Sequence, residues 1–105
     1  MKVFISQPMN GKSDEEITKA KEVAIEKFGK YLTKQEGNPS YEIINTFFPD
    51  YDGNALQFLG KGISEGLGVA DIAIFLPGWS EARGCKFEHD IAVAYGVKTF
   101  YINEV

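Results

Sequence analysis

The sequence predicts an α/β fold, a small three-layer sandwich in which helices cover both faces of a mainly parallel sheet of four or five strands. Two observations indicate this class. Short apolar runs alternate along the chain with longer segments of helical periodicity. Residues 72–76 form a continuous apolar run between turn residues, as expected for a strand buried on both faces. Right-handed crossovers would then bring the carboxyl ends of the strands to one edge of the sheet.

The first elements are a strand at residues 2–5 and a loop at residues 6–12. Pro8 and Gly11 prevent the strand from continuing through this loop. Ser13 and Glu16 then form a capping-box pattern, which predicts a helix from about residue 14 to about residue 35. The apolar residues of this helix fall on one core-facing stripe, comprising Ile17, Ala20, Ala24, Phe28, Tyr31 and Leu32.

The remaining elements repeat this alternation. Residues 41–45 and 98–102 read as strands, and residues 55–69 have helical periodicity that four glycines weaken. A further helix follows residue 86, with apolar positions at helical spacing and Gly96 as its end. Residues 47–54 are rich in aromatic, proline and glycine residues, which suggests a loop that covers another surface.

Length and charge limit the functions that this chain can have. Its 105 residues, of which 44% are hydrophobic, predict one compact domain over residues 1–105. A net charge of -4 disfavours binding to nucleic acid polymers or anionic membranes, and no signal peptide or membrane span is visible. The single Cys85 forms no internal disulfide or metal-binding cysteine set, so we expect a cytoplasmic protein without a metal or cofactor.

Residues 77–96 join the buried strand to the next helix and are the strongest candidate for a functional segment. Such a loop lies at the carboxyl edge of a parallel sheet, where open α/β folds bind ligands. Glu88, in the first turns of the helix, would face that crevice. A carboxylate there can act as nucleophile or general base when burial tunes its pKa. The alternative is an ordinary acidic residue stabilised by the helix dipole.

Other residues of this segment have two interpretations each. Arg83, with the amides of Gly84 and Cys85, could hold a phosphate or carboxylate at the helix N-terminus, or Arg83 could form a surface ion pair with Glu81. Trp79 could stack on a nucleobase or close the top of the sheet.

The chain offers further candidates with weaker patterns. Cys85 beside Lys86 could be a reactive thiol, although burial as a small apolar residue is the more ordinary role. His89 is the only histidine and is interpreted as a helix-surface residue. Asp71 precedes the central strand and is either a strand-end acid or a catalyst. The backbone of residues 6–11 could contact a phosphate or ribose, although it matches no dinucleotide-binding or P-loop pattern.

Two stretches, residues 4–11 and 70–96, together resemble the nucleoside 2-deoxyribosyltransferase superfamily, most closely its bacterial and phage branch. The first contains a strand that ends in Ser-Gln-Pro-Met. The second contains Pro-Gly-Trp, then Ala-Arg-Gly, then Glu-His, in the same order as in that branch. The resemblance implies a flavodoxin-like or Rossmann-like sheet with the carboxyl edge as the site.

The resemblance also implies a mechanism. The glutamate at the position of Glu88 would attack the anomeric carbon of a 2-deoxyribonucleoside, and a second base or water would resolve the covalent intermediate. Relatives that cleave nucleoside monophosphates often carry an aspartate where this chain has Ile63, followed by Ser64 and Glu65. The proton donor therefore stays open, and the candidates are Asp71, Glu65, Glu81, a partner subunit or water. Members often complete their sites across subunits, which implies a homo-oligomer.

The sequence thus predicts a binder of a nucleoside or nucleotide that cleaves or transfers its N-glycosidic bond. Glu88 and Asp71 are the catalytic candidates. The ligand-binding candidates are Ser6, Gln7, Met9 and Gly11 on the sugar or phosphate side, Trp79 near the base, and Arg83 with Gly84. We expect Glu88 to face residues 6–11 in a concave pocket. The alternative is a non-catalytic nucleotide-binding or regulatory module on the same fold.

Overall fold

The computed structural model describes residues 1–36, 40–45 and 51–102, and its strands form one parallel sheet. The strands are β1 (Lys2–Ser6), β2 (Glu42–Ile43), β3 (Ile72–Phe75) and β4 (Lys98–Tyr101), in the order β2-β1-β3-β4. All three pairings are parallel. The predicted α/β class is therefore confirmed, with four strands in the described part of the chain.

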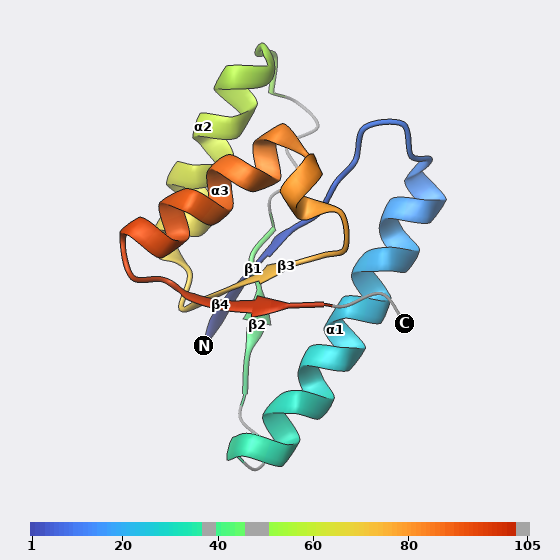
Figure 1. The fold of residues 1–105 in the computed structure, drawn as a ribbon, viewed down its shortest axis with the longest axis vertical. Helices are drawn as coiled ribbons and strands as arrows, with labels where there is room; N and C mark the ends of the chain where they lie inside the picture. The colour runs from blue at the N-terminus through green and yellow to red at the C-terminus, as the bar shows by residue number, and fades with distance from the viewer. Residues whose placement is uncertain (37–39, 46–50, 103–105) are drawn as a thin grey trace.

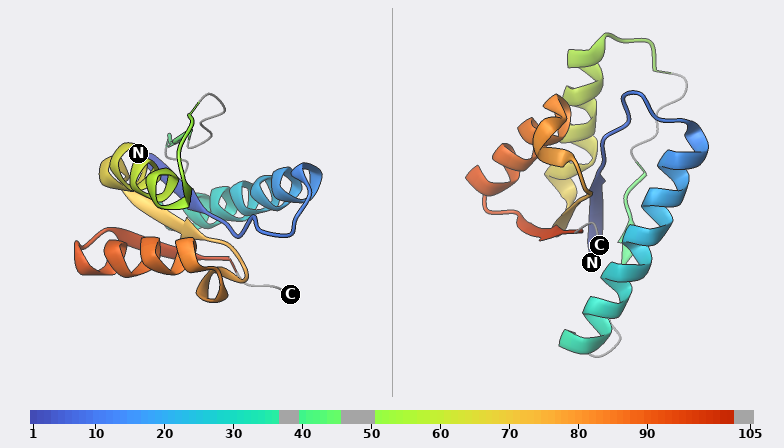
Figure 2. Two further views of the ribbon diagram at one scale, coloured as in Figure 1. Left: turned by 90° about the horizontal axis from the view of Figure 1, so that it is seen from above. Right: turned by 45° about the vertical axis from the view of Figure 1, so that its right-hand side comes forward.

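Helices lie on both faces of this sheet. Helix α1 (Asp14–Glu36) covers one face, whereas α2 (Ala55–Glu65) and α3 (Arg83–Ala94) lie on the other side (Figures 1 and 2). The layers are thus α1, the sheet, and the α2/α3 pair. None of the helices in the described part of the chain combines the length and apolar composition that a membrane-spanning helix requires.

Side chains of the capping residues fix where the helices begin. At α1, Ser13 Oγ accepts from the Glu16 backbone N–H and Glu16 Oε1 accepts from the Ser13 N–H, each at 3.2 Å, so the predicted capping box is confirmed. Asn54 and Gln57 form a second box at α2 through two bonds of 2.9 Å. This second box was not predicted, since the helix in this segment was inferred from the spacing of apolar residues alone.

The element bounds differ from the prediction in several places. The helix expected over residues 55–69 is two elements, because α2 ends at Glu65 and a 3₁₀ turn, η1 (Leu67–Val69), follows Gly66. The strand expected at residues 41–45 is only Glu42–Ile43. Strand β1 extends one residue further, to Ser6, which proves important for the site. Of the covering loop expected at residues 47–54, residues 47–50 lie outside the described part of the chain.

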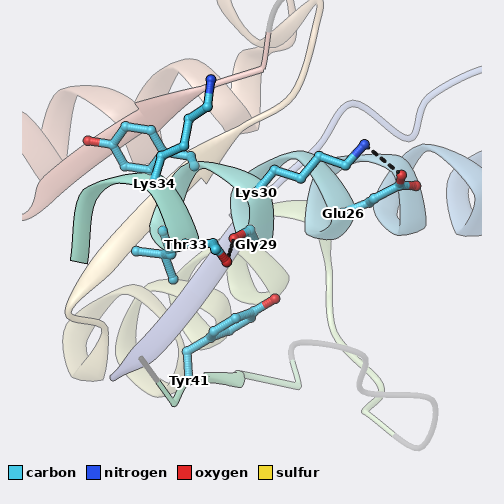
Figure 3. Close-up of a pocket in the computed structure, with 8 residues that line it drawn as sticks. Glu26, Gly29, Lys30, Thr33, Lys34 and Tyr41 are labelled. Carbon is cyan, nitrogen blue, oxygen red and sulfur yellow. Dashed lines mark hydrogen bonds and ion pairs between the residues drawn. The ribbon is translucent and has the colours of Figure 1, made fainter. Parts of the chain in front are cut away.

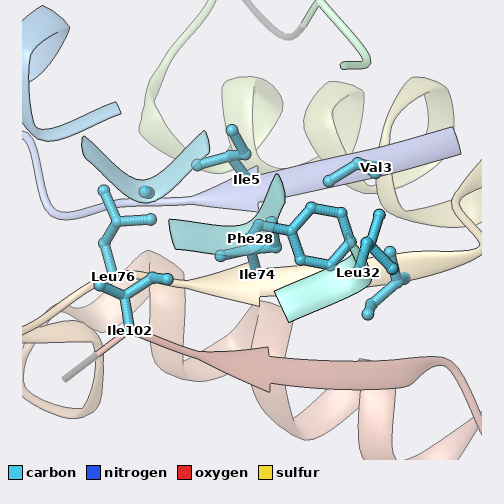
Figure 4. Packing of buried hydrophobic residues seen from close by; sticks show 9 residues of the cluster. Val3, Ile5, Phe28, Leu32, Ile74, Leu76 and Ile102 are labelled. Carbon is cyan, nitrogen blue, oxygen red and sulfur yellow. The ribbon is translucent and has the colours of Figure 1, made fainter. Parts of the chain in front are cut away.

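The alternation of side chains along β1 divides the core into two halves. Val3 and Ile5 pack with α1, whereas Phe4 packs on the other face beneath α3. Figure 4 shows Phe28 and Leu32 of α1 lying against the sheet residues of the first half. Because Ser6 continues this alternation, its side chain falls on the α2/α3 face.

Gly66 gives a test of how closely α2 approaches the sheet. A Cβ at Gly66 would lie 2.6 Å from the Gly62 carbonyl oxygen and 2.8 Å from Phe4 Cδ1. We expect Gly66→Ala to lower the free energy of unfolding by about 2 kcal/mol, since both neighbours are buried.

Gly60→Ala is the matched control, because a Cβ at Gly60 meets nothing within 4 Å. In the interior of α2 this change should leave stability unchanged or raise it by up to about 1 kcal/mol. Urea unfolding of both variants measures the difference. Equal stability of the two variants would show that α2 does not pack this tightly.

Candidate active site

The candidate site is built around a hydrogen bond between Ser6 and Glu88. Ser6 is the last residue of β1 and is buried, and its Oγ donates to Glu88 Oε1 at 2.7 Å. The two residues are 82 positions apart in the sequence, and each belongs to one of the two motifs singled out above. The predicted proximity of Glu88 to the segment after the first strand is therefore confirmed for Ser6.

Burial controls the electrostatics of Glu88. Its side chain lies between β1 and α2, and a Cβ at Gly62 of α2 would be 3.7 Å from Glu88 Oε2. Desolvation raises the pKa of Glu88, and the hydrogen bond from Ser6 opposes this by stabilising the carboxylate. This differs from an acidic residue stabilised by the helix dipole, because Glu88 lies beyond the first turn of α3 and bonds to a strand.

Cys85 lies beside Ser6 and Glu88 and forms a buried cluster with them. The thiol lies one turn before Glu88 on α3 and is 5% exposed. Burial raises the pKa of the Cys85 thiol, the nearby Ser6 hydroxyl lowers it, and the charge of Glu88 raises it. A thiol held in this form is a poor nucleophile, so packing rather than reactivity explains Cys85.

Trp79 belongs to an aromatic cluster beside this site. Its ring packs against that of His89 in a tilted arrangement, with centroids 4.1 Å apart and planes 30° apart, and it also contacts Phe75 and Tyr101. Tyr101 Oη and His89 Nε2 are hydrogen-bonded at 2.6 Å. Trp79 therefore closes the end of the sheet over β3 and β4. His89 is only 17% exposed and is not the surface residue that the sequence suggested.

Tyr101 is the residue of this cluster that sequence reasoning missed. Tyr101 of β4 pairs with Phe75 of β3, and Phe75 pairs with Ser6 of β1. The three residues therefore lie side by side across the sheet at its carboxyl edge. The strand itself was predicted, but its pairing partner depends on the order of strands in the sheet.

The structure does not gather the loop after β1 around Glu88. Gln7 Nε2 donates to the Ile17 carbonyl oxygen of α1 at 3.0 Å, on the opposite face of the sheet from Glu88. Met9 is 56% exposed. Gly11 has a φ of 78°, and the Lys12 amide donates to the Met9 carbonyl, so Gly11 supports a tight turn. Of these four loop candidates, only Ser6 contacts Glu88.

Arg83 and Gly84 form the first turn of α3. Arg83 is exposed, and the described residues show no ion pair between Arg83 and Glu81. A Cβ at Gly84 would lie 4.0 Å from Leu59 of α2, so Gly84 allows the two helices to approach. An anion-binding role for this turn stays a prediction.

Asp71 is not brought to the site. It precedes β3, and in a parallel sheet this position lies at the amino edge, whereas Ser6 and Glu88 lie at the carboxyl edge. Asp71 Oδ2 accepts from the Lys2 backbone N–H at 2.6 Å, so it acts as a strand-end acid. Lys2 and Ser6 are four residues apart along β1, which corresponds to about 13 Å.

Two pockets formed by described residues lie away from the Ser6–Glu88 pair. The pocket shown in Figure 3 lies between the second half of α1 and Tyr41, and none of the predicted site residues lines it. A second pocket includes Gln7 but neither Ser6 nor Glu88. The concave pocket expected around Glu88 therefore stays a prediction. The described residues contain no group of three or more histidine, cysteine or acidic residues that could hold a metal ion.

Comparison with known proteins adds no identification at this point. The chain matches none of the family models, none of the curated proteins and none of the solved structures with which it was compared. What the structure itself shows is a small α/β fold with a four-stranded parallel sheet.

The raised pKa of Glu88 has a consequence for stability. Because the folded protein holds this proton more tightly than the unfolded chain, Glu88 stabilises the fold fully below its unfolded pKa, near 4.5. That contribution is lost as the pH rises through the higher folded pKa. We expect Glu88→Gln to raise the free energy of unfolding at pH 7 by roughly 1 kcal/mol, a common size for one substitution.

The difference between Glu88→Gln and wild type should shrink toward pH 4. Urea unfolding at several pH values measures it, and Glu81→Gln on the surface is the control with the same charge change. A difference that is independent of pH would contradict the raised pKa of Glu88.

Proposed function

We propose that this protein cleaves or transfers the N-glycosidic bond of a nucleoside or nucleotide, with Glu88 as the nucleophile. The observation that carries the proposal is the partly buried carboxylate of Glu88 at the carboxyl edge, oriented by Ser6 at 2.7 Å. Carboxylates that are desolvated and held by a hydroxyl are the groups that glycoside chemistry uses at an anomeric carbon.

The reaction would run in two steps. A carboxylate oxygen of Glu88 attacks the anomeric carbon, the bond from carbon to the base nitrogen breaks, and its electron pair leaves with the base, which takes up a proton. Water or a second base then displaces Glu88 from the deoxyribosyl-enzyme and gives up a proton. The Ser6 hydroxyl would hold the carboxylate in place during both steps.

The resemblance to the nucleoside 2-deoxyribosyltransferase superfamily supports this proposal. It rests on two motifs, and residues from both meet in the Ser6–Glu88 hydrogen bond. A four-stranded parallel sheet with both motifs at its carboxyl edge fits the fold that the resemblance implies. Trp79 lies next to the site, and one face of its ring is packed against His89. Trp79 would therefore border the ligand rather than hold it by stacking.

The proton that the leaving base takes up needs a source other than Ser6 and Glu88. Asp71 lies at the other edge, and Glu65 is 53% exposed and pairs with Lys61 at 2.5 Å. Among the described residues, only burial and Ser6 shift the Glu88 pKa, so no second carboxyl group acts on it. We therefore place the donor in water or in a partner subunit of a homo-oligomer, and expect slow turnover that favours good leaving bases.

The alternative function is a non-catalytic nucleotide-binding or regulatory module. One observation favours it: burial raises the pKa of Glu88, and a neutral carboxyl group is a weak nucleophile. This module would bind the same ligands saturably and release no base.

Release of free base from a panel of deoxynucleosides and their monophosphates tests the proposal. For any accepted substrate, Glu88→Gln should reduce kcat by at least about a thousandfold while ligand affinity stays within a few fold. Glu65→Gln is the control, since it removes the same charge from an exposed position and should leave turnover unchanged. Binding without base release by wild type would favour the module, and full activity of Glu88→Gln would exclude Glu88 as nucleophile.

The pH dependence of kcat/KM gives an independent test of the role of Ser6. The nucleophile must be ionised, so activity should rise with pH through the raised pKa of Glu88. Ser6→Ala removes the hydrogen bond that lowers this pKa, so the rising limb should move to higher pH. If the rising limb of the kcat/KM profile stays at the same pH in Ser6→Ala, the group whose ionisation it reports is not Glu88. Ser6→Thr, which keeps a hydroxyl, should restore the limb toward its original position.

A further inference from the structure

Gly62 of α2 lies opposite Glu88 of α3, where the two helices lie side by side (Figures 1 and 2). A Cβ at Gly62 would lie 3.7 Å from Glu88 Oε2 and, within the described part of the chain, would meet no other heavy atom within 4 Å apart from the neighbouring residues of α2. We propose that Gly62 is a positioning residue of the candidate site. Its missing side chain leaves free the carboxylate oxygen that Ser6 does not hold, and this oxygen attacks the anomeric carbon. The inference rests on the function proposed above.

The two oxygens of the Glu88 carboxylate have different surroundings. Oε1 accepts the hydrogen bond from Ser6 Oγ at 2.7 Å. Oε2 accepts a hydrogen bond from none of the described residues. Every buried side-chain oxygen or nitrogen atom of the described residues has a hydrogen-bond partner, so Oε2 is not fully buried and keeps some contact with solvent. The bond from Ser6 thus fixes one oxygen and leaves the other with electron pairs available for nucleophilic attack.

Packing of α2 against the sheet does not require a glycine at position 62. At Gly66, where α2 ends, a Cβ would lie 2.6 Å from a backbone oxygen and 2.8 Å from Phe4, which is too close. At Gly62 the distance of 3.7 Å is an ordinary van der Waals contact. Alanine is also a better helix former than glycine. Alanine would therefore fit at this position and stabilise α2, and the group that its methyl would affect is the carboxylate of Glu88.

A methyl group at this position would act on the attack itself. The anomeric carbon must come to about 3–3.5 Å from the attacking oxygen before the reaction. A methyl group 3.7 Å from the same oxygen takes up part of the space around it and displaces water. During the attack, Oε2 forms a bond to the anomeric carbon and the bond to the base nitrogen breaks. The electron pair of that bond leaves with the base, which takes up a proton from water or from a partner subunit.

Two substitutions at Gly62 separate the steric effect from the electrostatic one. Burial raises the pKa of Glu88, and the Ser6 hydroxyl lowers it. Cys85, the titratable neighbour on α3, stays a neutral thiol because burial raises its pKa as well. Gly62→Ala adds desolvation and should raise the pKa of Glu88 further. Gly62→Ser fills the same space, but its hydroxyl can donate to Oε2 and should lower the pKa of Glu88 relative to Gly62→Ala.

The experiment measures the pH dependence of kcat/KM for base release from the panel of deoxynucleosides and their monophosphates. Above the rising limb, where Glu88 is ionised, Gly62→Ala and Gly62→Ser should each lose at least about tenfold in kcat/KM. The limb should lie at higher pH in Gly62→Ala than in wild type, and at lower pH in Gly62→Ser than in Gly62→Ala. Gly60→Ala is the matched control in the same helix, because a Cβ there meets nothing within 4 Å, and it should keep kcat/KM within about twofold.

Urea unfolding of the same variants separates this effect from a loss of folding. The urea midpoint of Gly62→Ala should equal or exceed that of wild type, as expected for an alanine that fits inside a helix. A lower midpoint would overturn the inference, because the glycine would then be required for packing.

The outcomes for Gly62 and for the proposed function are distinct. If wild type releases base and Gly62→Ala keeps the full kcat/KM above the rising limb, the function stands and the role of Gly62 is overturned. If wild type releases no base from any member of the panel, the proposed function fails and the inference fails with it.

Discussion

The alternation of side chains along β1 is the constraint on which the rest of the structure depends. Val3 and Ile5 must meet α1, so Phe4 and Ser6 must meet the helices on the other face. A shift of one residue would move Val3 and Ile5 to the α2/α3 face and turn the serine away from Glu88. The alternation of side chains that separates the two halves of the core therefore also determines on which face Ser6 can bond to the buried carboxylate of Glu88.

Fold and site were predictable from the sequence to different degrees. Periodicity and capping, which are local properties, predicted three features. These are the α/β fold class, the start of a helix at Ser13 and the central strand. The split of residues 55–69 at Gly66 was not local, because it depends on how closely that backbone approaches Phe4. The proximity of Glu88 to Ser6 was expected, because the segments that contain them were predicted to follow parallel strands. The positions of Gln7 and Asp71 were not, because spacing alone does not say which face or which edge a residue occupies.

The contacts between α2 and α3 show how small residues make the site possible. Gly62 of α2 faces Glu88 of α3, and Gly84 of α3 faces Leu59 of α2, so at each contact one of the two helices has no side chain. Close approach of α2 and α3 excludes water from the carboxylate and raises its pKa. Of the four glycines that weakened the helix prediction for residues 55–69, Gly62 is thus explained by packing against Glu88.

The packing of Trp79 against His89 has a spectroscopic consequence. The chain contains one tryptophan and one histidine, and their ring centroids are 4.1 Å apart. Tryptophan emission therefore comes from one place, the junction of the segment after β3 with α3 and β4. Any event that moves α3 at the residue next to Glu88 also moves the imidazole against the indole. The protein thus contains an intrinsic optical probe one residue away from its candidate nucleophile.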